Sequence, residues 1–349
     1  MKPVRIVLLA LLLTCAAAAR AAPLQSVFVF GDSLSDPGNA YALGGGLGGS
    51  FPPTYGYGSP VTRFTNGPTA AEVLSTRLGA SSGGVDAPGG GTNYAVGGAL
   101  SGTGNLNFLA ELPPGVRQAL PALQNTGVAS QVARFAAAPP AFDAAASLFM
   151  VWVGANDFFL WTVAGTPATL GPTAQAAAGN VRGAIDALYG LGAREFLVPN
   201  LPDLGAVPAT NASPPAAAAG SAYTGVFNAT LAALLGQARS TLPGIDIVSF
   251  DVAGLLDAIV TAPGAFGFTN ATDACSATAA ALAAGCAGYV FWDAVHPTAA
   301  AHALLGGRLA QAVPLPGTLA LLGAGVLFML PRTGTGRRRG RSGRAGRTA

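Results

Sequence analysis

Short apolar runs of strand length alternate with longer helical patterns along the middle of the chain. Five runs have the length and composition of strands: Ser26–Phe30, Asn93–Val96, Leu148–Val153, Glu195–Val198 and Ile245–Phe250. Because strands that alternate with helices form a parallel sheet covered on both faces, this order predicts an α/β fold with three layers, α/β/α. Ligands of such folds bind beyond the carboxyl ends of the strands, so chemistry is expected in the residues that follow each strand.

Four segments carry helical patterns. Thr69 and Glu72 have the spacing of a capping box, which predicts a helix that runs to Leu78. The other three patterns cover Thr173–Leu191, Ser221–Ser240 and Pro297–Val313, with the proline expected in the first turn of the last one. Segments rich in Gly, Ala or Pro are expected to be loops, and these are Gly44–Ser50, Ser81–Thr92 and Asn211–Gly220.

The amino-terminal segment has the order of a secretory signal. Lys2 and Arg5 precede an apolar run, and Ala19 and Ala21 place small residues where a signal peptidase reads them. Residues 1–21 are therefore predicted to be a signal peptide, and the protein is expected to be exported. Cleavage before Cys15, as in a lipoprotein, is the alternative.

The carboxyl-terminal segment, residues 313–349, combines a proline pair, an apolar stretch and an Arg-rich end. The apolar stretch Leu315–Leu330 has 16 residues and would span about 24 Å as a helix, less than the ~30 Å hydrocarbon core of a bilayer. This order resembles the PEP-CTERM sorting signal of bacteria, although Leu315 replaces the usual Glu. The resemblance implies a temporary membrane contact, a processing protease and a final location outside a Gram-negative-type cell or on its envelope. The alternative is a last core helix followed by a solvated tail.

Composition and charge narrow the function classes. Hydrophobic residues make up 51% of the 349 and charged residues only 9%, which excludes an intrinsically disordered protein. The formal charge of +3 comes from the two ends, because eight Arg face 15 acidic residues between Ala22 and Pro314. The predicted domain, residues 22–312, is thus acidic, which argues against a nucleic-acid partner.

Short segments of glycine or polar residues follow three predicted strands, and a fourth such segment lies near the end of the predicted domain. The four clusters are Gly31–Asp36, Gly97–Gly98, Gly154–Asp157 and Asp293–Pro297. Acyl transfer needs a nucleophile, a base, a group that orients the base and donors for an oxyanion. These clusters contain residues suited to each requirement.

The base is found by elimination between two histidines. His302 lies inside the last helical pattern, where a packed or capping role is expected. His296 stands at the start of that pattern with Asp293 three residues before it, so one turn can present both side chains together. The carboxylate would then accept the Nδ1 hydrogen and leave Nε2 free for a serine. Asp293 as a simple helix cap is the alternative.

Three further residues are candidates beyond successive strands. Ser33 is expected at a helix amino terminus, where its hydroxyl would be the nucleophile and its N–H an anion donor. Gly98 can bring a backbone N–H close because it has no side chain, with Gly97 as an alternative one position away. Asn156 can add an amide donor. Each residue could instead serve only as a turn or cap residue.

The motifs together identify a resemblance. Phe28–Asp36, Gly91–Gly98, Val153–Asp157 and Phe291–Thr298 resemble the four sequence blocks of the GDSL esterase/lipase (SGNH hydrolase) family. Arg63–Pro68 and Phe196–Asp203 are similar to its connecting segments, so the resemblance extends from Val27 to Leu309. It implies a flavodoxin-like fold without a metal or cofactor, and hydrolysis of a small-molecule or lipid ester through an acyl-serine.

The resemblance also implies a role for each candidate residue. Ser33 would be the nucleophile and an oxyanion donor, Gly98 and Asn156 the other donors, His296 the base and Asp293 its orienting group. An acyltransferase of the same fold and a non-catalytic surface-binding protein are the alternative functions.

Cysteine usage agrees with export. Cys275 and Cys286 are the only cysteines that remain if residues 1–21 are removed. In an oxidising compartment we expect them to form a disulfide, with two free thiols as the alternative.

Overall fold

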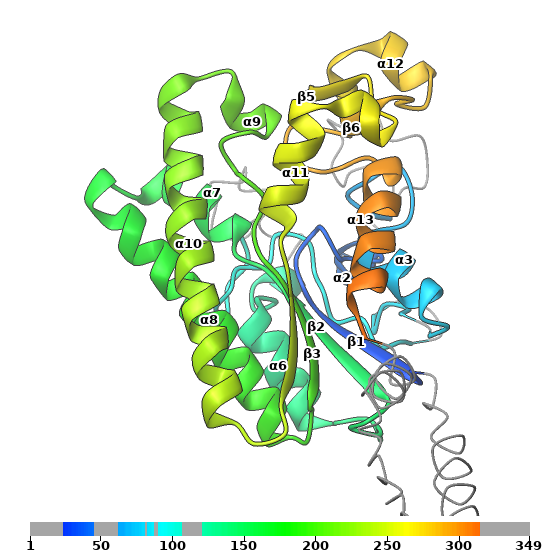
Figure 1. Cartoon of the computed structure of the whole chain (residues 1–349), viewed down its shortest axis with the longest axis vertical. Coiled ribbons are helices and arrows are strands. Elements are labelled where there is room, and N and C mark those ends of the chain that lie inside the picture. Colours follow the sequence, from blue (N-terminus) through cyan, green and yellow to red (C-terminus); the bar gives the residue numbers. More distant parts are fainter. Residues whose placement is uncertain (1–23, 45–61, 81, 87–89, 107–120, 315–349) are drawn as a thin grey trace, which may run out of the picture. The chain divides into compact units, whose positions relative to one another are not determined.

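A parallel sheet of four strands forms the centre of the protein. The computed structural model describes residues 24–44, 62–80, 82–86, 90–106 and 121–314 (Figure 1). The strands lie in the order β1-β2-β3-β4 and comprise Ser26–Gly31, Ser147–Trp152, Glu195–Pro199 and Asp246–Phe250. Four of the five predicted strands are therefore present within one or two residues of their expected bounds.

The fifth predicted strand, Asn93–Val96, lies beside β1 without forming a regular strand. Tyr94 N donates to Val29 O at 2.7 Å in a parallel arrangement. The Asn93 side chain, however, accepts a hydrogen bond from Ala95 N at 2.9 Å, and such a local turn interrupts the ladder. With this segment counted as an edge, the strand order is the flavodoxin-like 2-1-3-4-5.

Alternate strand residues pack against helices on opposite faces of the sheet. Phe28 and Phe30 of β1 belong to the core on one face, whereas Val27 and Val29 belong to the core on the other. The first face is covered by α6, α8 and α10, which comprise Val128–Ala137, Leu170–Gly190 and Pro214–Thr241. The second face is covered by α3 and α13, which comprise Ala70–Arg77 and Ala299–Ala312. The predicted three-layer α/β/α fold is thus confirmed.

Helix boundaries differ from the predictions where prolines are involved. The capping box at the start of α3 is present, since the side chains of Thr69 and Glu72 each accept from the other's backbone N–H. The predicted loop Asn211–Gly220 is wrong, because α10 already begins at Pro214. A proline is well suited to a first turn, whose N–H groups need no helical partner, and Ala favours the turns that follow. Pro297 instead precedes the Thr298 cap, so α13 starts later than expected.

The remaining elements surround the carboxyl edge of the sheet. The helices are α2 (Asn39–Leu43), α7 (Ala155–Ala164), α9 (Pro208–Asn211), α11 (Val252–Thr261) and α12 (Ala279–Ala283). Four 3-10 turns cover Pro121–Leu123, Pro167–Thr169, Pro263–Phe266 and Cys275–Ala277. Strands β5 (Asn270–Ala274) and β6 (Tyr289–Phe291) pair in a separate parallel sheet, and a disulfide joins Cys275 to Cys286 beside it.

The two terminal predictions concern residues outside this described part. Residues 1–21 and nearly all of 313–349 are not described, and the segment Pro23–Val313 forms one unit by its internal contacts. None of the helices within the described ranges has both the length and the apolar character needed to span a membrane.

His302 connects the two helices that cover the second face. Its side chain is buried in α13, and Nδ1 accepts a hydrogen bond from Ala70 N, at the start of α3, at 3.1 Å. Burial, with a smaller effect from the charge of His296, lowers the pKa of His302 to about 3. His302 is therefore a packed and capping residue, as its helical position predicted.

We predict that His302 makes the protein sensitive to acid. Folded His302 stays uncharged down to about pH 3, whereas the unfolded side chain takes up a proton near pH 6.5. Its contribution to stability is fully present above pH 6.5 and is lost as the pH falls toward 3, by up to ~1.4 kcal/mol per pH unit. In His302→Asn the amide oxygen can accept from Ala70 N without titrating. Urea unfolding should show a smaller loss of stability in the variant between pH 6.5 and 4, and equal losses would contradict this role.

We also predict a stability loss when the disulfide is removed. The bridge closes a short loop, with a sequence separation of 11 residues. A loop of this size restricts the unfolded chain enough to stabilise the fold by about 2–3 kcal/mol, so Cys275→Ser should lower the unfolding free energy by that amount. Reduced wild-type protein, as the control, should match the variant in urea unfolding. Titration of two free thiols in unreduced protein would contradict the bridge.

Candidate active site

Ser33, His296 and Asp293 form a continuous chain of hydrogen bonds. Nε2 of His296 lies 2.8 Å from Oγ of Ser33, and Nδ1 lies 2.7 Å from Oδ2 of Asp293. Only 1% of Asp293 is exposed to solvent, whereas the His296 side chain keeps 12% of its surface accessible. The three predicted residues are thus brought together although 263 positions separate Ser33 from His296.

The Asp293 carboxylate both shapes the turn and orients the imidazole. Its Oδ1 atom accepts hydrogen bonds from Val295 N at 2.9 Å and His296 N at 2.7 Å, while Oδ2 contacts the ring. Burial alone would raise the pKa of Asp293, but the charge of His296 and these hydrogen bonds outweigh burial and lower it. The capping and orienting interpretations of Asp293 are therefore compatible, because each uses a different oxygen.

The nucleophile candidate lies on a turn and not at a helix amino terminus. β1 ends at Gly31, Ser33 follows within a turn, and α2 begins only at Asn39, so the predicted helix start at Ser33 is wrong. The Asp32 side chain stabilises this turn by accepting from Leu34 N at 3.0 Å. Local side-chain acceptors of this kind compete with helix formation, which explains the difference.

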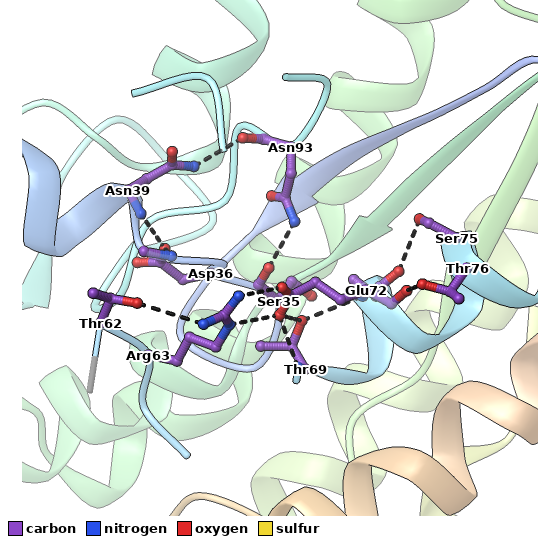
Figure 2. Close-up of polar contacts among 12 residues, drawn as sticks. Ser35, Asp36, Asn39, Thr62, Arg63, Thr69, Glu72, Ser75, Thr76 and Asn93 are labelled. Atoms are coloured by element: carbon purple, nitrogen blue, oxygen red, sulfur yellow. Dashed lines mark hydrogen bonds and ion pairs between the residues drawn. The ribbon is translucent and has the colours of Figure 1, made fainter. Parts of the chain in front are cut away.

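Asp36 ties the serine turn to the glycine pair. Its buried carboxylate accepts from Asn39 N at 2.6 Å and from Gly97 N at 2.8 Å, in addition to two other backbone N–H groups of α2 and its cap. Burial raises the pKa of Asp36 to about 6, although these donors oppose the rise. Figure 2 shows the surrounding contacts, in which Asn93 donates to Ser35 O and Asn39 donates to Asn93 O.

The two glycines have different structural roles. A Cβ atom on Gly97 would collide with the ring of Phe64, and the Gly97 N–H is already bound to Asp36. Gly98 adopts a φ of 79°, a conformation that favours glycine. Within the described residues the N–H groups of Gly98 and Ser33 meet no acceptor. Gly98 is therefore a better candidate than Gly97 for an oxyanion donor.

Asn156 lies near the glycine pair at the start of α7. Its Nδ2 atom donates to Ala99 O at 2.9 Å, which commits one of the two amide hydrogens and leaves the other. The next residue, Asp157, accepts from the N–H and the hydroxyl of Ser101 at 3.0 and 2.7 Å. These bonds fix α7 against the loop that carries Gly98.

The segment Arg63–Thr65, for which the sequence predicted no part in the site, lies beside His296. The ring of Phe64 packs against the His296 imidazole, with ring centroids 5.4 Å apart. Beside it, Thr65 donates to Pro297 O at 2.8 Å. Arg63 is held in turn by both carboxylate oxygens of Glu72 at 2.9 and 2.6 Å (Figure 2). Only the proximity in the fold reveals that this segment supports the histidine turn.

A cleft of about 860 Å³, open mouth included, begins at the candidate residues. Of the lining residues that the structure describes, Asp32, Ser33, Asn156 and His296 are polar and the others are apolar. Burial raises the pKa of Asp32 to about 7, although the Leu34 N–H and the charge of His296 oppose the rise. Within the described ranges no three potential metal ligands gather.

Comparisons with known proteins relate this chain to one family. A member of the lipolytic protein G-D-S-L family from Veillonella parvula DSM 2008 aligns with a TM-score of 0.40 and 12% identity, over 83% of this chain and 97% of that one. Two GDSL esterase/lipases of Arabidopsis thaliana are 27% and 30% identical to this chain. Those alignments cover 82% of this chain and 84% and 87% of the plant proteins. A family model of GDSL-like lipases and acylhydrolases matches residues 27–309, so the chain belongs to that family, and this membership supports a hydrolase activity.

We predict that the Asn156 amide contributes to turnover and not to stability alone. Loss of one oxyanion donor costs about 10²–10³-fold in kcat, because the donor binds the charge that develops in the transition state. Asn156→Ala should show this decrease with a nearly unchanged KM on a p-nitrophenyl ester. Ala99 would lose its hydrogen bond as well, so thermal unfolding must accompany the kinetics. A folded variant with kcat within a few-fold of wild type would contradict the role of Asn156 as an oxyanion donor.

Proposed function

We propose that this protein is a serine hydrolase of carboxylic esters that works through an acyl-serine intermediate. The observation that carries the proposal is the hydrogen-bond chain from Asp293 through His296 to Ser33, placed at the wall of an apolar cleft. A serine hydroxyl is by itself a weak nucleophile, and a histidine base held by a carboxylate is the usual means of activating it.

In the first half of the proposed reaction, Oγ of Ser33 attacks the ester carbonyl carbon while His296 Nε2 takes the hydroxyl proton. Negative charge that develops on the carbonyl oxygen is stabilised by the Ser33 and Gly98 N–H groups and by the second amide hydrogen of Asn156. Collapse of the tetrahedral intermediate breaks the bond to the alcohol oxygen, which receives the proton from Nε2. The alcohol leaves, and the acyl group remains on Ser33.

In the second half, water replaces the alcohol. His296 Nε2 accepts a proton from the water as its oxygen attacks the acyl carbon, and the same donors stabilise the second oxyanion. Cleavage of the bond to Oγ returns the proton to Ser33 and releases the carboxylic acid. Asp293 keeps the imidazole in the required orientation and stabilises its protonated form throughout.

Substitution of the proposed nucleophile and base tests this function. Ser33→Ala and His296→Ala should each lower kcat at least ~10⁴-fold, because the two residues act as one unit. A fluorophosphonate probe should label the wild-type protein at Ser33 and leave Ser33→Ala unlabelled. The control is His302→Asn, which changes the second histidine and should retain turnover. Equal losses from the two histidine variants would contradict the assignment of the base.

We further propose that the enzyme is exported and then released from a membrane. The Cys275–Cys286 disulfide supports folding in an oxidising compartment, and the basic-apolar-small order of residues 1–21 supports a signal peptide. The apolar part of residues 313–349 would hold the chain in the inner membrane, with its Arg cluster on the cytoplasmic side, until a protease cuts near Pro314–Pro316.

This export route predicts the mass of the mature protein. Protein purified from the native cell should begin near Ala22 and lack the Arg cluster, because both ends would have been removed. Intact-mass measurement shows whether both ends have been removed. A mature species that still ends at Ala349 would contradict the sorting signal, and one that still begins at Met1 would contradict the signal peptide.

A further inference from the structure

One wall of the cleft is formed by the apolar stripe of α11. Val252, Leu255, Leu256 and Ile259 of α11 all line the cleft. Their spacing of i, i+3, i+4 and i+7 places them on one face of the helix. Three of the four are buried among apolar side chains of neighbouring elements, and all four also border the cleft. This arrangement is what a site for an apolar ligand requires.

The opposite side of the cleft is also apolar. Ala301 and Leu305, one turn apart on α13, face the same volume, and Val290 and Phe291 of β6 complete the wall. Most of these side chains have less than a tenth of their surface exposed, so the cleft is enclosed at this wall. Ala301 is the smallest of these residues. Its size leaves space that a larger side chain would fill.

The polar chemistry of the lining excludes several ligand classes. Among the described residues no Lys or Arg lines the cleft, so a phosphate or carboxylate on the ligand would lack a cationic partner there. Apart from Ser33, Asn156 and His296, Asp32 is the only polar side chain that the described part of the lining contains, and Leu34 N already donates to it. The hydroxyl groups of a sugar would therefore lose water without gaining partners, which is unfavourable. A hydrocarbon chain makes no hydrogen bonds to water and therefore loses none when it enters the cleft.

The acyl part of an ester fits this enclosed volume better than the alcohol part. The alcohol must leave and water must enter between the two halves of the reaction, so that side of Ser33 has to stay open. The acyl group remains bonded to Ser33 until the last step. An enclosed apolar wall suits the group that stays.

We propose that the cleft between α11 and α13 binds the acyl chain of the substrate. The enzyme then prefers esters of longer unbranched acids over acetyl esters. Ala301 and Ile259 set the chain-length preference. This inference rests on the proposed esterase function and names its substrate class. Each methylene that enters the site would raise kcat/KM up to about fourfold.

Two ester series test the site. In the first, p-nitrophenyl acetate, butyrate, hexanoate, octanoate and decanoate vary the acyl chain. We expect kcat/KM for octanoate to exceed that for acetate at least tenfold in the wild-type protein. In the second, ethyl, butyl, hexyl and octyl acetates vary only the alcohol, with acid release followed by titration. We expect little dependence on chain length there.

The variants are designed as a matched set. Ala301→Leu adds bulk to the wall and should lower the octanoate-to-acetate ratio of kcat/KM at least tenfold. Ala303→Leu makes the same change at an exposed position of the same helix and should keep the wild-type ratio. Ile259→Ala should shift the optimum toward decanoate, and it tests the site independently if Ala301→Leu does not fold.

The outcomes distinguish this inference from the proposed function. A wild-type protein that is labelled by the fluorophosphonate probe and hydrolyses acetate, but shows no acyl-chain dependence, would overturn the acyl-chain site alone. The same holds if Ala301→Leu and Ile259→Ala leave the chain-length profile unchanged, or if the dependence appears only in the alcohol series. A wild-type protein that is neither labelled nor active on any ester would overturn the proposed function itself.

Discussion

Parallel pairing of the strands is the constraint on which the candidate site depends. Because β1, β2 and β3 run in one direction, the loops that follow them meet at a single edge of the sheet. Ser33 and Asn156 reach that edge from β1 and β2, and Gly98 follows the segment paired with β1. His296 lies in the turn between β6 and α13. The parallel sheet brings Ser33, Gly98 and Asn156 together, and the separate sheet of β5 and β6 leads into the turn that adds His296.

Buried carboxylates then fix the loops that the sheet brings together. Asp36 binds backbone N–H groups from the serine turn and the glycine pair, Asp157 binds Ser101, and Asp293 binds its own turn and the imidazole. A buried carboxylate without partners is costly, whereas one that accepts several N–H groups holds a loop in one arrangement. Catalysis through oriented donors needs such fixed loops, since donors that must reorganise stabilise the transition state less.

The two sides of the sheet serve different purposes. The face covered by α6, α8 and α10 is closed by a dense aromatic core, with Phe28 stacked on Phe149 at a centroid distance of 4.9 Å. Near α11 and α13 the apolar side chains border the cleft instead. Side chains of α11 pack within the protein and also line the cleft, so that an apolar ligand bound there would add contacts to the same helix face.

Sequence alone determined the α/β class, four of the strands and the Thr69 cap, because these features depend on local patterns. It also identified Ser33, Asp293 and His296 as candidates, because they lie in short motifs. It did not determine that Ser33 lies on a turn, that α10 begins at Pro214, or that Pro297 precedes its helix, since local caps and tertiary packing compete at such boundaries. Only the tertiary structure decided that Asp36 binds the Gly97 N–H while the Gly98 N–H meets no acceptor among the described residues. The same holds for the support that Phe64 gives to His296 and for the position of α11 beside the cleft. These facts depend on contacts between segments distant in sequence, and no local pattern encodes such contacts.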